Sequence, residues 1–204
     1  APIVARMDHD DVSLPDRLKK QLAFLEEHPE LAIICSWEYG IDAANRTVRK
    51  WSGVVENYGG FLGPLILANC SIWHPSIMFR KDVVMNVGGY KKEYQPVEDF
   101  ELTMRLALAG YRTAIVQEYL VSWRHHGQRQ SVIKFRAQMD MRALVHKEMV
   151  QKFFRGSQED VDNLAGFLRI DPLFWGASRS KESFYKIFDS LDKLFKRMRL
   201  ALNL

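Results

Sequence analysis

Three carboxylates stand close together near the beginning of the chain, directly behind a short apolar stretch. Residues 2–5 are apolar, and Asp8, Asp10 and Asp11 follow them. An apolar run with charged residues behind it is typical of a strand buried in a parallel sheet. Carboxylates two residues apart on an extended segment can converge on one hard cation, and Mg²⁺ and Mn²⁺ are usually bound by one or two carboxylates together with substrate phosphates. Asp8 and Asp10 therefore suit a metal and phosphate site, with a solvated acidic turn as the alternative.

Two further groups of residues have types that could take part in chemistry. Glu98 and Asp99 begin the segment 98–109, whose apolar residues recur at helical spacing. Acidic side chains at that place can also serve only to stabilise the positive end of the helix. His125 and His126 are adjacent, so in a strand they point to opposite faces and only one of them can reach a given site. For His126, an ordinary partly buried histidine is the alternative.

The elements expected to position these residues alternate between strands and helices, which predicts an α/β fold. A helix should open at 13–16 and run to Glu27, with Leu14, Leu18, Leu22 and Leu25 at helical spacing. The other expected helices are 81–86, 98–109, 131–154 and 183–202, and the expected strands are 31–37, 76–79, 112–116 and 119–123. Residues 38–64 are polar and contain several glycines, so a long irregular excursion is expected there.

Composition and charge exclude several classes of protein. The 204 residues are 47% apolar and 26% charged, which is ordinary for a globular protein and excludes disorder and a disulfide scaffold. The net charge of +4 lies entirely in residues 178–204, because residues 1–177 contain as many acidic as basic side chains. A nucleic-acid partner is therefore not expected. Cys35 and Cys70 stand in apolar contexts, which predicts buried free thiols and a reducing compartment.

Three segments together resemble the signatures of family 2 glycosyltransferases. The stretch ARMDHDDVSLPDRLKKQLAFLEEHPELAIICS is similar to the family's ARMDADDISLPxRLxxQxxFLExxPEIxIVGS. The segment HPSIMFRKDVVMNVGGYKKEYQPVEDFELTMRLALAGY is similar to HPSVMFRKxVxxxxGGYxxxxxxxEDYDLWLRLxxxG, and SWRHHGQRQS is similar to YRxHxxQxS. They occur in the family's order and cover residues 1 to about 131. The resemblance implies that 1–131 is the C-terminal half of a GT-A domain with a Rossmann-like, mostly parallel sheet, followed by a helical extension over 132–204.

The resemblance also implies a reaction and the residues that perform it. The reaction is transfer of a sugar from a nucleotide-diphosphate donor to an acceptor hydroxyl with inversion, as in the synthesis of cell-envelope polysaccharides, and the acceptor is a glycan or a lipid-linked sugar. Asp8 and Asp10 match the D-x-D pair that binds the donor and a divalent metal, Mn²⁺ or Mg²⁺, and Arg6 stands beside them. Asp99 matches the general base, and His126 matches a histidine that can join the metal or diphosphate site. The residues that match the acceptor side are His74, Ser76, Gly88, Gly89, Tyr90 and Glu98.

This sequence departs from the family pattern at two places. Family members carry a nucleotide-binding stretch before the D-x-D pair, and no such stretch precedes Asp8 here. The expectation is that the chain is the later, metal-, acceptor- and base-bearing part of a larger domain. The alternative is a truncated, catalytically incompetent binding or scaffold module. His9 replaces the usual small residue between the aspartates, where it either crowds the metal site or points away.

The last predicted helix, over 183–202, has one apolar stripe and a basic opposite side. Three interpretations stay open: the stripe packs on the domain, it lies on anionic lipid, or it meets a partner helix. Peripheral membrane contact through 183–202 would place a cytoplasmic glycosyltransferase at the inner face of the membrane.

Overall fold

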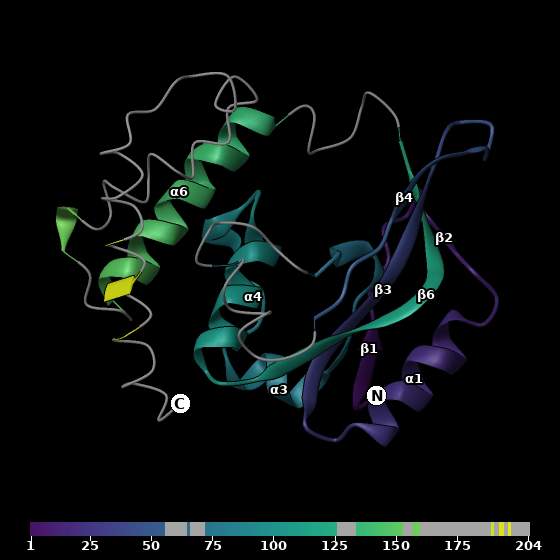
Figure 1. Ribbon diagram of the computed structural model, residues 1–204, viewed down its shortest axis with the longest axis horizontal. Coiled ribbons are helices and arrows are strands. Elements are labelled where there is room, and N and C mark those ends of the chain that lie inside the picture. Colours follow the sequence, from purple (N-terminus) through teal and green to yellow (C-terminus); the bar gives the residue numbers. More distant parts are fainter. Residues whose placement is uncertain are drawn as a thin grey trace.

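The computed structural model describes residues 1–55, 65, 72–125, 134–152 and 157–159, together with 189, 192, 193 and 196. The described residues form a mixed α/β structure in which helix α1 (Arg17–Glu27) covers one side of a curled sheet. Helix α4 (Glu98–Leu108) covers the other side, and α6 (Phe135–Lys152) packs against α4 (Figure 1). His126, Cys70 and most of the predicted helix 183–202 lie outside the described residues.

The described strands form one six-stranded sheet with the order β1-β5-β3-β6-β2, and β4 pairs with β3 beside this path. The strands are β1 (Ile3–Ala5), β2 (Val12–Ser13), β3 (Leu31–Ile41), β4 (Thr47–Trp51), β5 (Met78–Arg80) and β6 (Arg112–Arg124). Only β3 and β6 pair in parallel among them, whereas the other four pairings are antiparallel. The α/β class is confirmed, but these strands make a mixed sheet rather than the mostly parallel one expected.

Strand β1 also pairs antiparallel, although a buried strand of a parallel sheet was predicted for it. It pairs antiparallel with β5 through Ile3, Val4 and Ala5, and its residues are half-buried or exposed. The apolar run therefore marks an edge of the described sheet rather than a central parallel strand.

The helices predicted from local signals are confirmed closely. Besides α1 and α4, the short helix α3 (Lys81–Asn86) ends before two glycines with positive φ, Gly88 at 93° and Gly89 at 63°. The 3₁₀ turns η1 (His74–Ser76) and η2 (Lys92–Tyr94) precede β5 and α4. Two expectations were wrong: residues 112–124 form one continuous strand, and residues 38–51 form a β3–β4 hairpin rather than an irregular excursion.

Long-range hydrophobic contacts divide the core between the two faces of the sheet. On the α1 side, Leu25 packs with Ile34, Met78, Val116 and Leu120. On the α4 side, the largest buried cluster joins strand residues with α4 and α6; its members include Ile33, Cys35, Phe79, Phe100, Leu106, Val145 and Met149. Helix α6 thus shares the core of the sheet rather than standing apart from it.

Helix α1 buries a different face from the one that its leucines suggest. Arg17 and Gln21 are almost completely buried, whereas Leu18 and Leu22 are 56% and 38% exposed. The buried polar side chains find partners in the main chain of neighbouring loops, as shown below. The leucine spacing therefore predicted the helix correctly but not the face that packs on the sheet.

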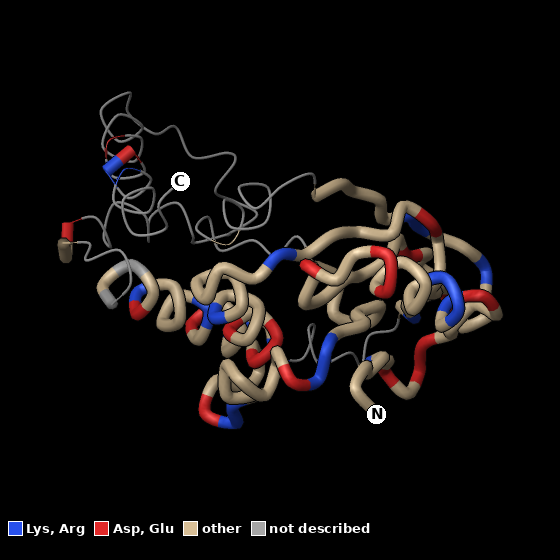
Figure 2. Tube along the Cα trace, turned by 90° about the horizontal axis from the view of Figure 1, so that it is seen from below, with Lys and Arg blue, Asp and Glu red and all other residues tan. Residues whose placement is uncertain are grey.

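Charged residues of both signs are interspersed along the described part of the chain (Figure 2). No helix among the described residues is long and apolar enough to cross a membrane.

Candidate active site

The loop that joins β1 to β2, residues 6–11, carries the predicted metal- and donor-binding aspartates and is called the acidic loop. Arg6 Nη1 donates to Asp8 Oδ2 at 2.8 Å, and Nη2 donates to the other carboxylate oxygen. Two residues predicted to bind the donor therefore form one bidentate ion pair. The side chain of His9 is 98% exposed, and its Nδ1 lies 3.9 Å from Oδ1 of Asp10, so His9 borders the acidic loop on its solvent side.

Asp11 fastens the acidic loop to the sheet. Its side chain is buried, and its Oδ1 accepts a hydrogen bond of 2.9 Å from the main-chain N–H of Arg124 on β6. Burial, reinforced by the charges of Asp8 and Asp10, raises the pKa of the Asp11 carboxyl to about 6. Asp11 is thus a structural member of the acidic cluster, since its carboxylate faces the protein interior.

The Arg124 side chain holds the same loop from a second direction. Its Nε donates to the main-chain oxygen of Asp10 at 2.9 Å, and its two terminal nitrogens donate to Asp42 O at 3.0 Å and Asn45 Oδ1 at 2.8 Å. Arg124 is the arginine of the third family-like segment, and it joins the acidic loop to the β3–β4 hairpin. The third family-like segment predicted a role only for His126, so the positioning role of Arg124 was not predicted.

Buried polar residues of α1 position both the acidic loop and the turn before β5. Arg17 Nη2 donates to the main-chain oxygen of Arg6 at 2.6 Å, and Arg17 Nε donates to Gln21 Oε1 at 2.9 Å. Gln21 Nε2 donates to the main-chain oxygen of Ser76 at 2.7 Å. One face of α1 therefore fixes the spacing between the aspartates and the η1 turn.

The acidic loop fits a hard divalent cation as an open site rather than a closed cage. The side chains of Asp8 and Asp10 are 36% and 28% exposed. Among the residues that the structure describes, no group of three or more His, Cys, Asp or Glu side chains converges as a metal cage would require. Mg²⁺ usually takes one or two carboxylates and completes its shell with phosphates and water, so the ligand types and their exposure suit an ion that arrives with a diphosphate.

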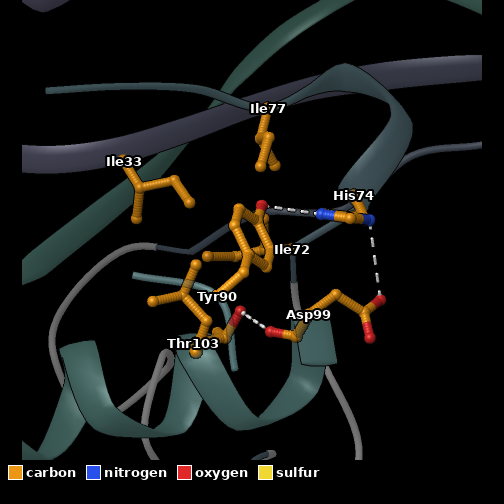
Figure 3. Close-up of a pocket in the computed structure, with 8 residues that line it drawn as sticks. Ile33, Ile72, His74, Ile77, Tyr90, Asp99 and Thr103 are labelled. Atoms are coloured by element: carbon orange, nitrogen blue, oxygen red, sulfur yellow. Dashed lines mark hydrogen bonds and ion pairs between the residues drawn. The ribbon is translucent and has the colours of Figure 1, made fainter. Parts of the chain in front are cut away.

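Asp99 lies in the first turn of α4 and faces the η1 turn. Its Oδ1 accepts a hydrogen bond of 2.8 Å from the N–H of Phe100, and its side chain is 39% exposed. Its Oδ2 lies 3.9 Å from Nδ1 of His74, and Nε2 of His74 lies 2.8 Å from the hydroxyl of Tyr90 (Figure 3). Three residues predicted separately, as base and as acceptor side, therefore form one continuous chain of polar contacts.

Burial determines the protonation states of His74 and Tyr90. Desolvation lowers the pKa of His74 to about 4, against the opposing effect of the Asp99 carboxylate, so the imidazole is neutral at physiological pH. The hydroxyl of Tyr90 points toward His74 although 41% of the residue is exposed, and desolvation raises its pKa to about 12. Beneath them lies a cavity of about 10 Å³, about the volume of a single water.

The η1 turn links the two predicted halves of the site. The main-chain N–H of Arg6 on the acidic loop donates to the oxygen of Ile77, directly after η1, at 3.0 Å, and Oδ2 of Asp99 on α4 lies 3.9 Å from Nδ1 of His74 in η1. The structure thus brings the D-x-D loop, the histidine of η1 and the candidate base together. Of the predicted site residues, His126 lies outside those described.

The glycine pair before Tyr90 is held by the helix that carries Asp99. Arg105 on α4 donates to the main-chain oxygens of Val87 and Gly89, the latter at 2.6 Å, and its guanidinium pairs with Glu101 at 2.6 Å. Positive φ at both glycines allows the turn. The relative positions of Tyr90 and Asp99 are therefore fixed through one arginine.

Two predicted acceptor-side residues have a different environment from the one expected. Ser76 is completely buried, and its Oγ lies 3.1–3.2 Å from the main-chain O and N of Ser36. Its hydroxyl thus connects η1 to β3 instead of facing an acceptor. Glu98 is half-buried, and its Oε2 has no hydrogen-bond partner among the described residues.

Glu38 is a buried acid near the acidic loop that the sequence did not reveal. It lies on β3, is 3% exposed, and its pKa rises to about 7, mainly through burial and in part through the charge of Asp11. Ser76 and Arg17 act in the opposite direction. No local signal distinguishes this glutamate from an exposed one, because its burial comes from packing.

An aromatic cluster closes the hairpin end of the sheet. Trp51 stacks on His125 with ring centroids 5.1 Å apart, and Trp123 meets both rings edge-on. A Cβ on Gly40 would lie 2.5 Å from Trp51, so only glycine fits below the indole. His125 therefore packs within this aromatic cluster and is not part of the acidic loop.

Comparison with known proteins identifies the relatives of this arrangement. The family model described as glycosyl transferase family group 2 matches residues 3–161. The amylovoran biosynthesis glycosyltransferase AmsE of Erwinia amylovora is 30% identical over 127 residues, which cover 60% of this chain and 44% of AmsE. The O-antigen biosynthesis glycosyltransferase WbnJ of Escherichia coli is 30% identical over 128 residues, covering 62% of this chain and 48% of WbnJ.

A solved structure is similar in fold. The crystal structure of S. aureus TarS 1–349 in complex with UDP matches with a TM-score of 0.51 at 17% identity, covering 97% of this chain and 56% of that chain. The chain thus spans about half the length of the curated relatives it matches.

Proposed function

Because the chain belongs to glycosyl transferase family group 2, we propose that it is the metal-, acceptor- and base-bearing part of an inverting glycosyltransferase. The donor is a nucleotide-diphosphate sugar, and the acceptor is a hydroxyl of a glycan or lipid-linked sugar in polysaccharide assembly. The biosynthetic roles in the names of AmsE and WbnJ and the UDP bound to TarS support this assignment.

The acidic loop serves the donor in this proposal. Asp8 and Asp10 would hold Mn²⁺ or Mg²⁺ together with the diphosphate, and Arg6 adds a positive charge beside them. The bound cation would stabilise the negative charge that develops on the leaving diphosphate. Three side chains keep the loop in place. Arg17 and Arg124 donate hydrogen bonds to its main-chain oxygens, and the buried carboxylate of Asp11 accepts one from the main chain of β6.

Asp99 serves the acceptor. An alcohol is a weak nucleophile, so a carboxylate within hydrogen-bond reach must accept its proton during attack on the anomeric carbon. The observation that carries the proposal is the half-exposed Asp99 carboxylate, which lies 3.9 Å from His74 of η1, the turn that Arg6 of the acidic loop adjoins through its hydrogen bond to Ile77. A plain helix-capping acid would need no such neighbours.

The test is Asp99→Asn, which keeps the size of the side chain and its place in α4. With the family's nucleotide-binding stretch joined in front of residue 1, release of UDP from UDP-glucose, UDP-galactose and UDP-N-acetylglucosamine is measured with Mn²⁺ and a glycolipid extract of the source cells. UDP affinity is measured separately by calorimetry. We expect the rate to fall roughly 10²- to 10⁴-fold, the usual contribution of a general base, with UDP affinity unchanged.

The matched control is Asp82→Asn, an exposed acid on α3, which should leave both quantities unchanged. A rate for Asp99→Asn within a few-fold of the wild type would reduce Asp99 to a helix cap. A wild-type protein that binds UDP but releases it from none of the three donors would favour the alternative of a non-catalytic binding module.

Two further proposals rest on the sequence alone. Residues 132–204 would form a helical extension of the GT-A part, and residues 183–202 would contact anionic lipid at the inner face of the membrane. Co-sedimentation with anionic and neutral vesicles, comparing the full chain with a version that ends at Gly176, measures this contact. Equal binding of both versions would remove the membrane assignment.

A further inference from the structure

We propose that His74 is a positioning residue that, held by the Tyr90 hydroxyl at Nε2, directs its Nδ1–H at Oδ2 of Asp99. This inference rests on the proposed function, because it assigns a role toward the candidate base. It starts from the contact chain in Figure 3, with 2.8 Å between Tyr90 and Nε2 and 3.9 Å between Nδ1 and Asp99.

Electrostatics select one tautomer of His74. A neutral imidazole has one N–H donor and one lone-pair nitrogen. If the proton were on Nε2, the lone pair of Nδ1 would face the Asp99 carboxylate, and two electron-rich groups would meet. If the proton is on Nδ1, the Tyr90 hydroxyl donates to Nε2 and the Nδ1–H faces the carboxylate. Only the second arrangement makes both contacts favourable.

His74 and its partner Tyr90 are both held in place by the surrounding fold. The η1 turn is fixed through Ser76, whose main-chain oxygen accepts from Gln21 and whose hydroxyl lies against Ser36 of β3. Tyr90 follows the glycine pair that Arg105 holds from α4. The imidazole is mostly buried, with 20% of its side chain exposed. The ring therefore has a defined orientation before any ligand binds.

The consequence for Asp99 is that both carboxylate oxygens have a protein donor beside them. Oδ1 accepts from Phe100 N–H at 2.8 Å, and Oδ2 has the histidine at 3.9 Å. That separation is longer than a hydrogen bond, and such contacts in unliganded sites commonly shorten in the reacting complex. A donor at Oδ2 restricts rotation of the carboxylate. The remaining lone pairs stay directed at the half-exposed side, where an acceptor hydroxyl would approach.

Other charges near this group are few among the described residues. Arg6 and Asp8 on the acidic loop act on His74, and Glu98 acts on Tyr90. The variants below leave all three unchanged, so differences between the variants report on the His74 contact.

The first measurement does not depend on activity. Long-range ¹H–¹⁵N correlation spectra of the ¹⁵N-histidine-labelled protein at neutral pH identify which ring nitrogen of His74 carries the proton. We expect the Nδ1–H tautomer in the wild type and a mixed population in Tyr90→Phe, which removes the donor to Nε2. A wild-type spectrum with the proton on Nε2 would overturn the proposal.

The second measurement compares two substitutions that each keep half of the imidazole. In His74→Asn the side-chain amide can supply an N–H near the Nδ1 position, whereas in His74→Gln the amide lies near the Nε2 position. For UDP release, we expect His74→Gln to lower kcat roughly tenfold to a hundredfold with little change in KM for the UDP-sugar. His74→Asn should retain most of kcat.

Rescue by the conservative variant separates positioning from a merely structural role. A donor near the Nδ1 position can direct the Asp99 carboxylate, so kcat should be largely retained in His74→Asn and lost in His74→Gln, while both variants melt at the same temperature. His28→Gln, at the end of α1, is the control and should change nothing. Equal losses of kcat in both His74 variants would refute the positioning role. If Asp99→Asn is itself fully active, the base assignment fails whichever tautomer is observed.

Discussion

Glu38→Gln removes a charge from the interior of the sheet and should stabilise the folded protein at alkaline pH but not at acidic pH. Glu38 is 3% exposed, and its Oε1 has no hydrogen-bond partner among the described residues. The pKa of Glu38 is raised from 4.5 to about 7. Burial is the largest cause, and the charge of the nearby Asp11 contributes to the same rise. Arg17 lies close enough to oppose this effect but does not cancel it.

The sign follows from proton linkage. The folded state holds the Glu38 proton more tightly than the unfolded state does, so the contribution of Glu38 to stability is fully present below about pH 4.5 and is lost as pH rises through about 7. A rise of this size corresponds to about 3 kcal/mol at pH values above both pKa values. Glutamine has nearly the same shape and no charge, so the variant avoids this cost.

The assay is urea unfolding of the wild-type protein and the variant at about pH 5 and about pH 8.5. We expect the variant to gain roughly 1–3 kcal/mol relative to the wild type at the higher pH and little at the lower one. Glu26→Gln, at an exposed position of α1, is the control and should show no such difference. A Glu38→Gln variant whose stability relative to the wild type does not depend on pH would refute the reasoning.

Three further predictions test the packing and the loop. Gly40→Ala places a Cβ 2.5 Å from Trp51, so it should cost about 1–3 kcal/mol of stability and alter tryptophan fluorescence; an unchanged urea midpoint would contradict the close contact. Arg105→Lys should cost roughly 1–3 kcal/mol, because lysine cannot pair with Glu101 and also reach the two loop oxygens; thermal melting measures this, and a wild-type melting temperature would count against it. With the family's nucleotide-binding stretch restored in front of residue 1, Asp10→Asn should weaken Mn²⁺-dependent binding of UDP in calorimetry, because an amide is a poorer ligand for a hard cation, and an affinity unaffected by either the variant or a chelator would argue against Asp10.

Local signals in the sequence were sufficient for several elements and for the nature of the site. Helix α3 was predicted with its observed bounds, because the residues 81–86 end at a glycine pair that only a turn accommodates. The start of α4 at Glu98 was predicted because the apolar residues of 98–109 recur at helical spacing. The motif segments supplied the family, since residue types at fixed spacing depend only on the chain itself.

Pairing between distant segments explains what was missed in the fold. Polar residues and glycines at 38–51 suggested a loop, but Asp42 accepts hydrogen bonds from the N–H groups of Ala44 and Arg46 at 2.9 Å each, which closes a turn and lets β4 pair with β3. Asn45 completes the turn with a φ of 61°. Strand direction is likewise decided by which strands meet, so the mixed sheet was not visible in an apolar run.

Tertiary contacts also decided which polar residues are buried and which meet. Leucine spacing predicted α1, yet Arg17 and Gln21 form its buried face because loop carbonyls from other segments satisfy them. His74 and Asp99 are far apart in sequence, and the folded chain brings Nδ1 of His74 within 3.9 Å of Oδ2 of Asp99. Residue types and their local spacing were therefore sufficient to predict the family, the short helices and the acidic and basic groups available for chemistry. The burial, protonation and partners of these groups follow from the folded chain, because desolvation and hydrogen bonding depend on neighbours that come together only on folding.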